Sequence, residues 1–419
     1  MERKLAYFFL NHLTAFPQET LKRMTDLAGD PEELFRLSSG DLREEGILLG
    51  LAEQMQYEEF RNEDRLARLY EAMEQKDVVY LSREDEDFPD KLLSLEDAPY
   101  GLFFLGPLPD FNAPGAAIVG SRRCTSYGKE MAAFFGRELA RHGVLVVSGM
   151  ALGVDGYAGR GALQGHGRHA AVLGGGVDVC YPRENIDLYA ALREQGVLIS
   201  ERPPGKTAMP YDFPIRNRII SGLSDVLLII EAAPNSGSLI TADLANRQGR
   251  EVFALPGRVG DRMSEGANRL IRDGAQCLLS PEDVLQRLGL QVGTDTVKRP
   301  RVRLSEMEKL VYGEIGRTPA DLENLHHMTG IPFTVLPEIL ISLEIKGLIK
   351  KEAAGGRGSR CRARNGGATR SGRRRRYGGS GRGARRRRAP RSGWAPGRRG
   401  CEGAKDPSLR GMLDRKSVV

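Results

Sequence analysis

The sequence predicts an α/β protein built on a doubly wound, mostly parallel sheet, with a helical N-terminal module and a C-terminal winged-helix-like module. Two observations predict this. Within residues 116–288, seven near-continuous apolar runs alternate with helical patterns, which is typical of parallel strands covered on both faces. Residues 1–75 and 304–354 instead have apolar residues at three-to-four spacing, the period of amphipathic helices.

Length and composition favour a soluble protein of two or three domains. The chain has 419 residues, of which 40% are hydrophobic. No apolar run reaches the length of a membrane span, and polar residues interrupt the N-terminus too early for a signal peptide, so we expect a cytoplasmic protein without a membrane partner. The five cysteines form no C-x-x-C pair, which indicates neither a disulfide framework nor a zinc site.

The net charge of +7 is unevenly distributed along the chain. Residues 355–419 hold 21 Lys and Arg against 3 Asp and Glu, a charge of +18. Of the chain's 62 basic and 55 acidic residues, 41 and 52 therefore fall in residues 1–354, whose net charge is −11. An acidic fold repels phosphate at long range, so nucleic-acid binding would need a local basic patch.

In chain order, residues 1–75 predict a small helical module, of the SAM or helix-hairpin-helix kind. Residues 76–288 form the sheet domain, which opens with a short strand, a helix and a second strand before the seven apolar runs. A polar linker follows at 289–303. The seven predicted strands read "AAIVG", "VLVVSG", "HAAVLGG", "VLISE", "VLLIIEA", "EVFALPG" and "AQCLL".

Residues 304–354 show three helical segments, the pattern of a winged helix-turn-helix, but the wing that should follow is missing. The tail at 355–419 is rich in Arg and Gly with almost no aliphatic residues, so we expect disorder. It is either an RGG-like nucleic-acid arm or an out-of-frame translation of GC-rich DNA. The abrupt break at the missing wing favours the second interpretation.

The first loop of the predicted sheet combines features that suit a phosphate. Gly120 permits a tight turn, the following helix presents free backbone N–H groups, and Arg122 adds a guanidinium fork. The loop lacks the G-x-G-x-x-G pattern. Because Ser148 and Gly149, not an acidic residue, end the second strand, the sequence argues against a dinucleotide site.

Later loops repeat this chemistry at the same predicted edge of the sheet. Glycines at Gly174 and Gly175 would let a ligand approach the backbone closely. A Pro-rich loop leads into a helix that bears Arg216–Arg218. The turn Ser236–Ser238 begins another helix and offers a second anion site.

Each loop alone also fits a structural alternative. A glycine after a strand is commonly a turn requirement. Arg216 and Arg218 could pair with Asp225 and Glu231, and Phe213 could either stack a base or pack in a core. The co-occurrence of such loops at one edge favours a ligand-binding edge.

The sequence contains few recognisable catalytic motifs, so we predict that the chain is not an enzyme. It contains no Ser-His-Asp order, nucleophile elbow, P-loop or metal-ligand cluster, and we expect no cofactor and no metal.

Seven blocks of the chain resemble the DNA-processing protein A family (DprA, also called Smf). They include "AIVGSRRCTSYG", "FPIRNRIISGLSDVLLIIEA" and "SGSLITADLANRQGREVFALPG", in the family's order and spacing over about 115–280. The resemblance implies an extended Rossmann-like domain that binds single-stranded DNA and forms a homodimer. It also implies protection of incoming DNA and loading of the recombinase RecA during natural transformation and recombination.

Carried over by motif, the resemblance places a phosphate pocket at the Gly-Ser-Arg turn, the Arg-Asn-Arg block and the Ser-Gly-Ser turn, with two basic residues from loops nearby. Together with the strand-end loops, the predicted nucleic-acid-binding residues are Gly120, Ser121, Arg122, Ser148, Gly149, Gly174, Gly175, Arg183, Lys206, Arg216, Asn217, Arg218, Ser236, Gly237 and Ser238.

Two other functions compete with this hypothesis. A phosphoribohydrolase-like enzyme of the same superfamily would need a Pro-Gly-Gly-x-Gly-Thr loop followed by a catalytic Glu, whereas the equivalent loop here reads "APNSGSLITAD". A purely structural adaptor would leave Arg122 and Arg218 without a role. The Arg-rich tail departs from the family's usual ending and puts the integrity of the last domain in question.

Overall fold

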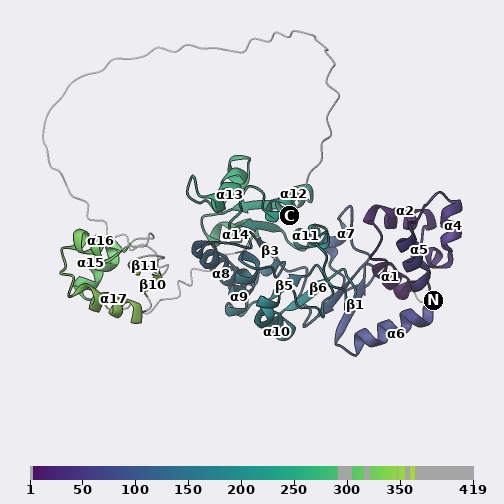
Figure 1. Cartoon of the computed structure of the whole chain (residues 1–419), viewed down its shortest axis with the longest axis horizontal. Helices are drawn as coiled ribbons and strands as arrows, with labels where there is room; N and C mark the ends of the chain where they lie inside the picture. The colour runs from purple at the N-terminus through teal and green to yellow at the C-terminus, as the bar shows by residue number, and fades with distance from the viewer. Residues whose placement is uncertain (1–2, 291–303, 316–320, 347, 354–358, 364–419) are drawn as a thin grey trace, which may run out of the picture. The chain divides into compact units, whose positions relative to one another are not determined.

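The computed structural model describes residues 3–290, 304–315, 321–346, 348–353 and 359–363 (Figure 1). The chain divides into two compact units, residues 1–297 and 298–419, which we treat separately. Most of the predicted linker and the tail from residue 364 onward lie outside the described residues.

Six helices precede the sheet, and side-chain caps begin several of them. Asp30, Ser38 and Asn62 each accept a hydrogen bond from a backbone N–H of the helix that they start. The helices are α1 (Arg3–His12), α2 (Gln18–Ala28), α3 (Pro31–Arg36), α4 (Ser39–Glu44), α5 (Leu51–Phe60) and α6 (Glu63–Glu74).

The helical module is attached to the sheet through α1. Phe8 packs edge-on against Tyr80 and Phe103 of the first two strands, with ring centroids 5.1 and 5.8 Å away. The Asn11 side chain donates to the carbonyls of Gly101 and Glu201 at 2.9 and 3.0 Å. Buried aromatic contacts and hydrogen bonds from the Asn11 side-chain amide therefore join the module to the sheet.

Nine strands form one sheet in the order β1-β2-β6-β5-β4-β3-β7-β8-β9. All seven predicted strands are present and run parallel, which confirms the predicted α/β class, while β1 and β2 form an antiparallel edge. The strands are β1 (Val78–Ser82), β2 (Gly101–Leu105), β3 (Gly115–Val119), β4 (Leu145–Ser148), β5 (His169–Val172), β6 (Val197–Ser200), β7 (Val226–Ile229), β8 (Glu251–Ala254) and β9 (Gln276–Cys277).

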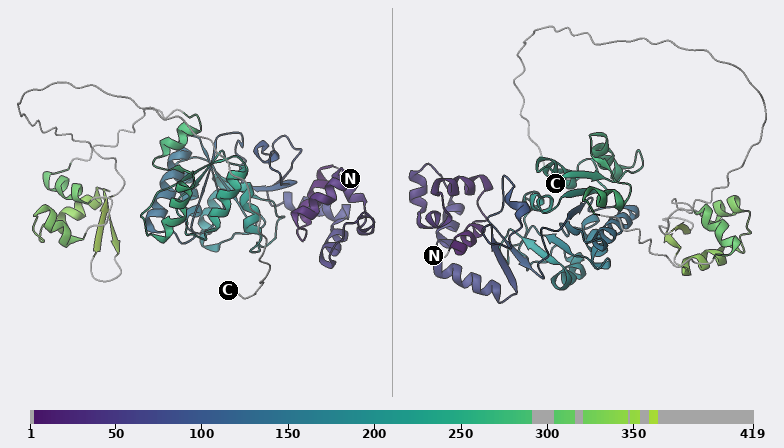
Figure 2. Two further views of the ribbon diagram at one scale, coloured as in Figure 1. Left: turned by 90° about the horizontal axis from the view of Figure 1, so that it is seen from above. Right: turned by 180° about the vertical axis from the view of Figure 1, so that it is seen from behind.

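Helices cover both faces of the sheet, as Figure 2 shows. One core joins α8, α9 and α14 to the strands, and a second joins α7, α11, α12 and α13 to the opposite face. The connecting helices are α7 (Asp90–Leu93), α8 (Ser126–Arg141), α9 (Val154–Gln164), η1 (Arg183–Asn185), α10 (Ile186–Gln195), α11 (Asp212–Gly222), α12 (Gly237–Arg247), α13 (Arg262–Arg272) and α14 (Pro281–Arg287).

Helices α8 and α9 cross at very short range because each presents a glycine to the other. A Cβ at Gly136 would collide with the carbonyl oxygen of Ala158, and one at Gly161 would collide with that of Ala133. The close crossing carries the loops that precede both helices to the carboxyl edge of β3 and β4.

The described part of the second unit contains three helices and a hairpin, the element order predicted for a winged helix. The helices are α15 (Glu306–Glu314), α16 (Leu322–Thr329) and α17 (Leu336–Ile345), around a core that includes Val311, Leu325 and Leu343. Strands β10 (Ile349–Ala353) and β11 (Ser359–Ala363) pair in antiparallel register. The expectation of a missing wing is therefore wrong, since ordered pairing extends past residue 354 into the segment expected to be disordered.

The glycine crossing gives a stability prediction. Gly161→Ala should lower the free energy of unfolding by about 1–3 kcal/mol, because the new methyl overpacks a rigid backbone contact. Urea unfolding measures the change. Gly313→Ala in α15 is the matched control, since its Cβ would meet no heavy atom within 4 Å. Equal effects of the two substitutions would contradict the packing argument.

Candidate nucleic-acid interface

One pocket opens at the carboxyl edge of the sheet, where the loops after β3, β4 and β5 meet the start of α11. The space in it open to a water molecule is about 40 Å³, so the pocket is small. Three predicted residues, Arg122, Gly149 and Arg216, meet there. The complete lining is Arg122, Gly149, Ala151, Leu152, Tyr181, Pro182, Phe213 and Arg216.

Two guanidinium groups lie over the Phe213 ring in this pocket. The Cζ atoms of Arg122 and Arg216 are 5.2 and 6.0 Å from its centroid. Tyr181 packs against the same ring, with centroids 5.6 Å apart, and remains 51% exposed. The pocket therefore combines positive charge with an open aromatic surface.

Arg216 is buried and forms the rear wall of the pocket. Its guanidinium donates to the carbonyl of Gly149 at 3.1 Å and to that of Val172. Burial lowers the pKa of Arg216 to about 10, and the Asp155 carboxylate opposes this shift. Arg216 therefore stays cationic at neutral pH. Burial raises the pKa of Asp155, whose carboxylate accepts a hydrogen bond from the Gly149 N–H at 2.8 Å.

The strand-end glycines make room for the chain itself. A Cβ at Gly149 would stand 2.6 Å from the Arg216 guanidinium, and one at Gly174 would stand 3.1 Å from the Phe213 ring. A Cβ at Gly175 would stand 2.6 Å from the Lys206 carbonyl oxygen. The expectation that Gly174 and Gly175 admit a ligand is wrong, because the loop leading into α11 already fills that space.

A buried carboxylate holds the first loop in place. Glu231, just after β7, accepts hydrogen bonds from the backbone N–H and the hydroxyl of Thr125 at 2.8 and 2.6 Å. The Glu231 carbonyl accepts one from the Ser121 N–H at 2.7 Å, and the Thr125 hydroxyl caps the Gly128 N–H. The protein's own carboxylate and capping hydroxyl therefore bind the Thr125 and Gly128 N–H groups at this helix start, at the switch point between β3 and β7.

Arg218 points away from the pocket although it is two residues from Arg216. It is only 2% exposed, and its guanidinium pairs with Glu201 at 2.7 Å and Asp97 at 3.0 Å. Successive helix positions turn by about 100°, so residues two apart face different neighbours. Arg218 joins α11 to the ends of two loops, and the structure does not bring it to the predicted site.

Ser148 is also enclosed. It is 0% exposed, and its hydroxyl lies 3.3 Å from Nε2 of His169, whose Nδ1 lies 2.9 Å from the Val146 carbonyl. This serine–histidine pair cannot reach a substrate, because both side chains are fully buried. It stabilises the core beneath the pocket.

The other predicted residues lie at the same edge but outside the pocket lining. Arg183 is exposed at the start of η1, and Lys206 is half-buried in the loop before α11. Among the residues that the structure describes, no carboxylate forms an ion pair with Arg122, Arg183 or Lys206. Gly120 and Ser121 form the turn before Arg122, and Asn217 accepts a bond from Nε of Arg216 at 3.3 Å.

The Ser-Gly-Ser turn caps its own helix. The Ser236 hydroxyl accepts from the Ser238 N–H at 3.4 Å and lies 2.8 Å from the Ser238 hydroxyl. Gly237 is exposed between them. The turn follows β7, so it lies at the same edge of the sheet as Arg122 but does not contribute to the pocket.

Sequence reasoning missed the residues that shape the loop before α11. Asp212 is 2% exposed, pairs with Arg202 at 2.6 Å and accepts from the Met209 N–H at 2.8 Å. This buried pair fixes the loop that presents Phe213. The acidic residue between two prolines in "MPYDFP" was the available signal. Tyr181 carried no comparable signal, because its partner Phe213 is distant in sequence.

Two features are absent from the described part of the chain. No group of three or more His, Cys, Asp or Glu side chains there could hold a metal ion. No helix there is long and apolar enough to cross a membrane.

Comparisons with known proteins agree with one another. Residues 79–289 match the family model described as DNA recombination-mediator protein A. Protein Smf of Escherichia coli is 45% identical over 217 residues, covering 52% of this chain and 58% of that protein. DNA processing protein DprA of Bacillus subtilis is 37% identical over 225 residues, covering 54% of this chain and 76% of that one.

A solved structure is similar as well. The X-ray structure of DNA processing protein A from Streptococcus pneumoniae is 32% identical in sequence. It aligns with a TM-score of 0.58 and covers 67% of this chain and 97% of that one. Sequence and fold therefore point to the same relatives.

The buried histidine gives a pH prediction. Burial lowers the pKa of His169 to about 4 from its ordinary 6.5. Below pH 6.5 the unfolded chain therefore binds a proton that the folded chain excludes, and stability should fall as the pH drops from 6.5 towards 4, by about 1.4 kcal/mol per pH unit. Burial lowers the pKa of His12 to about 4 too, which adds a parallel contribution.

Urea unfolding at pH 7, 6 and 5 measures this slope. His169→Gln should flatten it between pH 6 and 5, whatever the substitution does to stability at pH 7. His142→Gln is the control at an exposed histidine. A slope that His169→Gln leaves unchanged would contradict the assignment.

Proposed function

The chain belongs to the DNA recombination-mediator protein A family, and on that premise we propose that it binds single-stranded DNA and passes it to a recombinase. The observation that carries the proposal is the pocket in which Arg122 and Arg216 lie over the half-buried Phe213 ring, beside the exposed Tyr181 ring. Its chemistry suits a phosphate next to an unpaired base.

The phosphate contact is assigned to Arg122. Its side chain is exposed, lies over Phe213, and forms no ion pair within the described chain. A planar guanidinium donates two parallel hydrogen bonds to a phosphate, which a lysine ammonium does not. Arg216 adds a second positive charge behind it, with the carboxylate of Asp155 as its counter-charge.

The base contact is assigned to Tyr181, which is 51% exposed and packs against the Phe213 ring. Aromatic side chains stack on the face of any base, and each stacked base contributes about 1–3 kcal/mol. In a duplex these faces are covered by neighbouring pairs, so the pocket selects single strands. Because neither a phosphate nor a stacked face carries sequence information, binding should be insensitive to sequence.

The distribution of charge along the chain supports DNA binding at one local site and not over the whole surface. The acidic residues 1–354 disfavour non-specific adsorption of DNA over the whole fold. Binding is then restricted to the basic positions at the carboxyl edge, Arg122, Arg183, Lys206 and Arg216.

The cellular role is proposed from the relatives. The relatives from Bacillus subtilis and Streptococcus pneumoniae are called DNA processing proteins, and the family model is described as a recombination mediator. A mediator in this sense delivers single strands to a recombinase such as RecA, so we place the chain in recombination and natural transformation, acting as a homodimer. The enclosed Ser148 and His169 favour a binding role over a catalytic one.

Removing the Arg122 guanidinium tests the pocket. Arg122→Ala should weaken binding to single-stranded oligonucleotides about tenfold or more, equally for poly-dT and mixed sequences, because a charge-assisted bond is lost. The slope of log affinity against log salt should shrink by about 0.7. Fluorescence anisotropy measures both.

Arg247→Ala is the matched control for that variant. It removes the same charge from an exposed position at the far end of α12. If both variants lose affinity equally, long-range charge and not the pocket is responsible, and the assignment fails.

Removing the Arg-rich tail tests where DNA binds. A chain that ends at Ala363 keeps both strands of the hairpin. It should retain Arg122-dependent binding, with the same ratio of affinities between wild type and Arg122→Ala as in the full chain. Loss of all binding on truncation would instead assign the DNA contact to residues 364–419.

A further inference from the structure

Helix α17 stands where a helix-turn-helix module carries its recognition helix, yet its sequence does not suit DNA. A recognition helix enters the major groove between phosphate backbones, where positive charge is favoured. The ten residues of α17, LPEILISLEI, contain two glutamates and no lysine or arginine.

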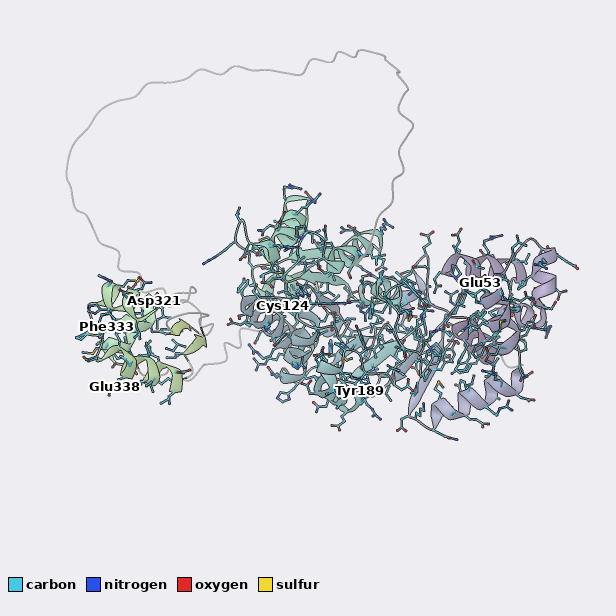
Figure 3. All side chains as sticks on the ribbon, viewed as in Figure 1. Glu53, Cys124, Tyr189, Asp321, Phe333 and Glu338 are labelled. Atoms are coloured by element: carbon cyan, nitrogen blue, oxygen red, sulfur yellow. The ribbon has the colours of Figure 1, made fainter. Side chains whose placement is uncertain are left out.

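The outer face of α17 carries a stripe of exposed apolar residues bordered by two glutamates. Pro337, Ile341 and Ile345 recur every four residues and therefore share one face, with Ile341 57% and Ile345 81% exposed. Exposed Glu338 and Glu344 border this stripe on its two sides, within an arc of roughly 120° at 3.6 residues per turn. Figure 3 shows Glu338 on the outside of the helical unit.

Lys346, the cation that directly follows α17, is paired with a carboxylate. Its ammonium group lies 2.7 Å from the Glu308 carboxylate. The same carboxylate accepts a bond from the Ser342 hydroxyl at 2.6 Å. This pairing joins α17 to α15 and leaves the outer face with two negative charges.

We propose that the outer face of α17, defined by Pro337, Glu338, Ile341, Glu344 and Ile345, binds a protein segment that carries basic side chains around an apolar anchor. The apolar stripe supplies area to bury, and regularly spaced exposed residues on one helix face suit a helical partner. The two glutamates complement lysine or arginine on that partner and repel phosphate. The inference concerns the second unit alone and holds whatever the pocket of the first unit binds.

A peptide selection on the full chain tests this proposal. The probe is a library of random 12-residue peptides displayed on phage, selected against the wild type. Enriched peptides should carry Arg or Lys beside Leu, Ile, Phe or Trp. A synthetic copy should bind the wild type in an anisotropy titration and lose at least tenfold in affinity with Ile341→Asp or with the double reversal Glu338→Lys and Glu344→Lys.

Matched variants separate this face from general charge. Glu323→Lys reverses an exposed charge on α16, outside the α17 face, and should leave peptide binding unchanged. Arg122→Ala should do so as well. Circular dichroism and thermal melting check folding, which a change at the exposed Ile341 should not disturb.

Three outcomes would overturn the proposal. Peptides could bind wild type and Ile341→Asp equally, or no basic peptide could be enriched. Duplex DNA could bind the chain and lose affinity with Ile341→Asp, which would make α17 a DNA-reading helix. Light scattering could show that Ile341→Asp separates a dimer into monomers, which would make the occupant a second copy of this chain.

Discussion

The arrangement of the carboxyl edge depends on one buried carboxylate, that of Glu231. In a doubly wound sheet, ligands lie at the point where the strand order reverses, here between β3 and β7. Glu231 occupies this point and holds Thr125 and Ser121. The first loop is therefore fixed by the protein, and the accessible pocket is displaced towards β4 and β5. The strand order is that of a dinucleotide-binding sheet, but the protein's own Glu231 fills the switch point.

The two arginines of the pocket, Arg122 and Arg216, differ in burial and in their hydrogen-bond partners. Arg216 is enclosed, with the Gly149 and Val172 carbonyls as acceptors and Asp155 as its counter-charge. Arg122 is exposed and forms no ion pair within the described chain. One guanidinium therefore shapes the wall and raises the local potential, while the other is free to bond. Glycines at 149 and 174 are required because their side-chain space holds Arg216 and Phe213.

Sequence alone predicted the sheet well because parallel strands are apolar on both faces, and parallel strands bring their following loops to one edge. It assigned Arg216 and Arg218 to one site, since a linear motif does not show that helix geometry separates them. It expected a ligand to lie against Gly174 and Gly175. A glycine in the sequence does not reveal whether a ligand or another part of the chain fills the space beside it. It missed the hairpin because an Arg-rich composition concealed the pairing of β10 with β11.

The buried ion pair of Arg202 and Asp212 fixes the loop that presents Phe213, without any ligand. A site with its shape already set loses little conformational entropy on binding, and its association rate is set by diffusion and steering. Every nucleotide of a strand offers the same phosphate and a similar aromatic face. For the proposed DNA contact, one nucleotide can thus replace the next without reorganising the protein, and the strand can move through the pocket without a fixed register.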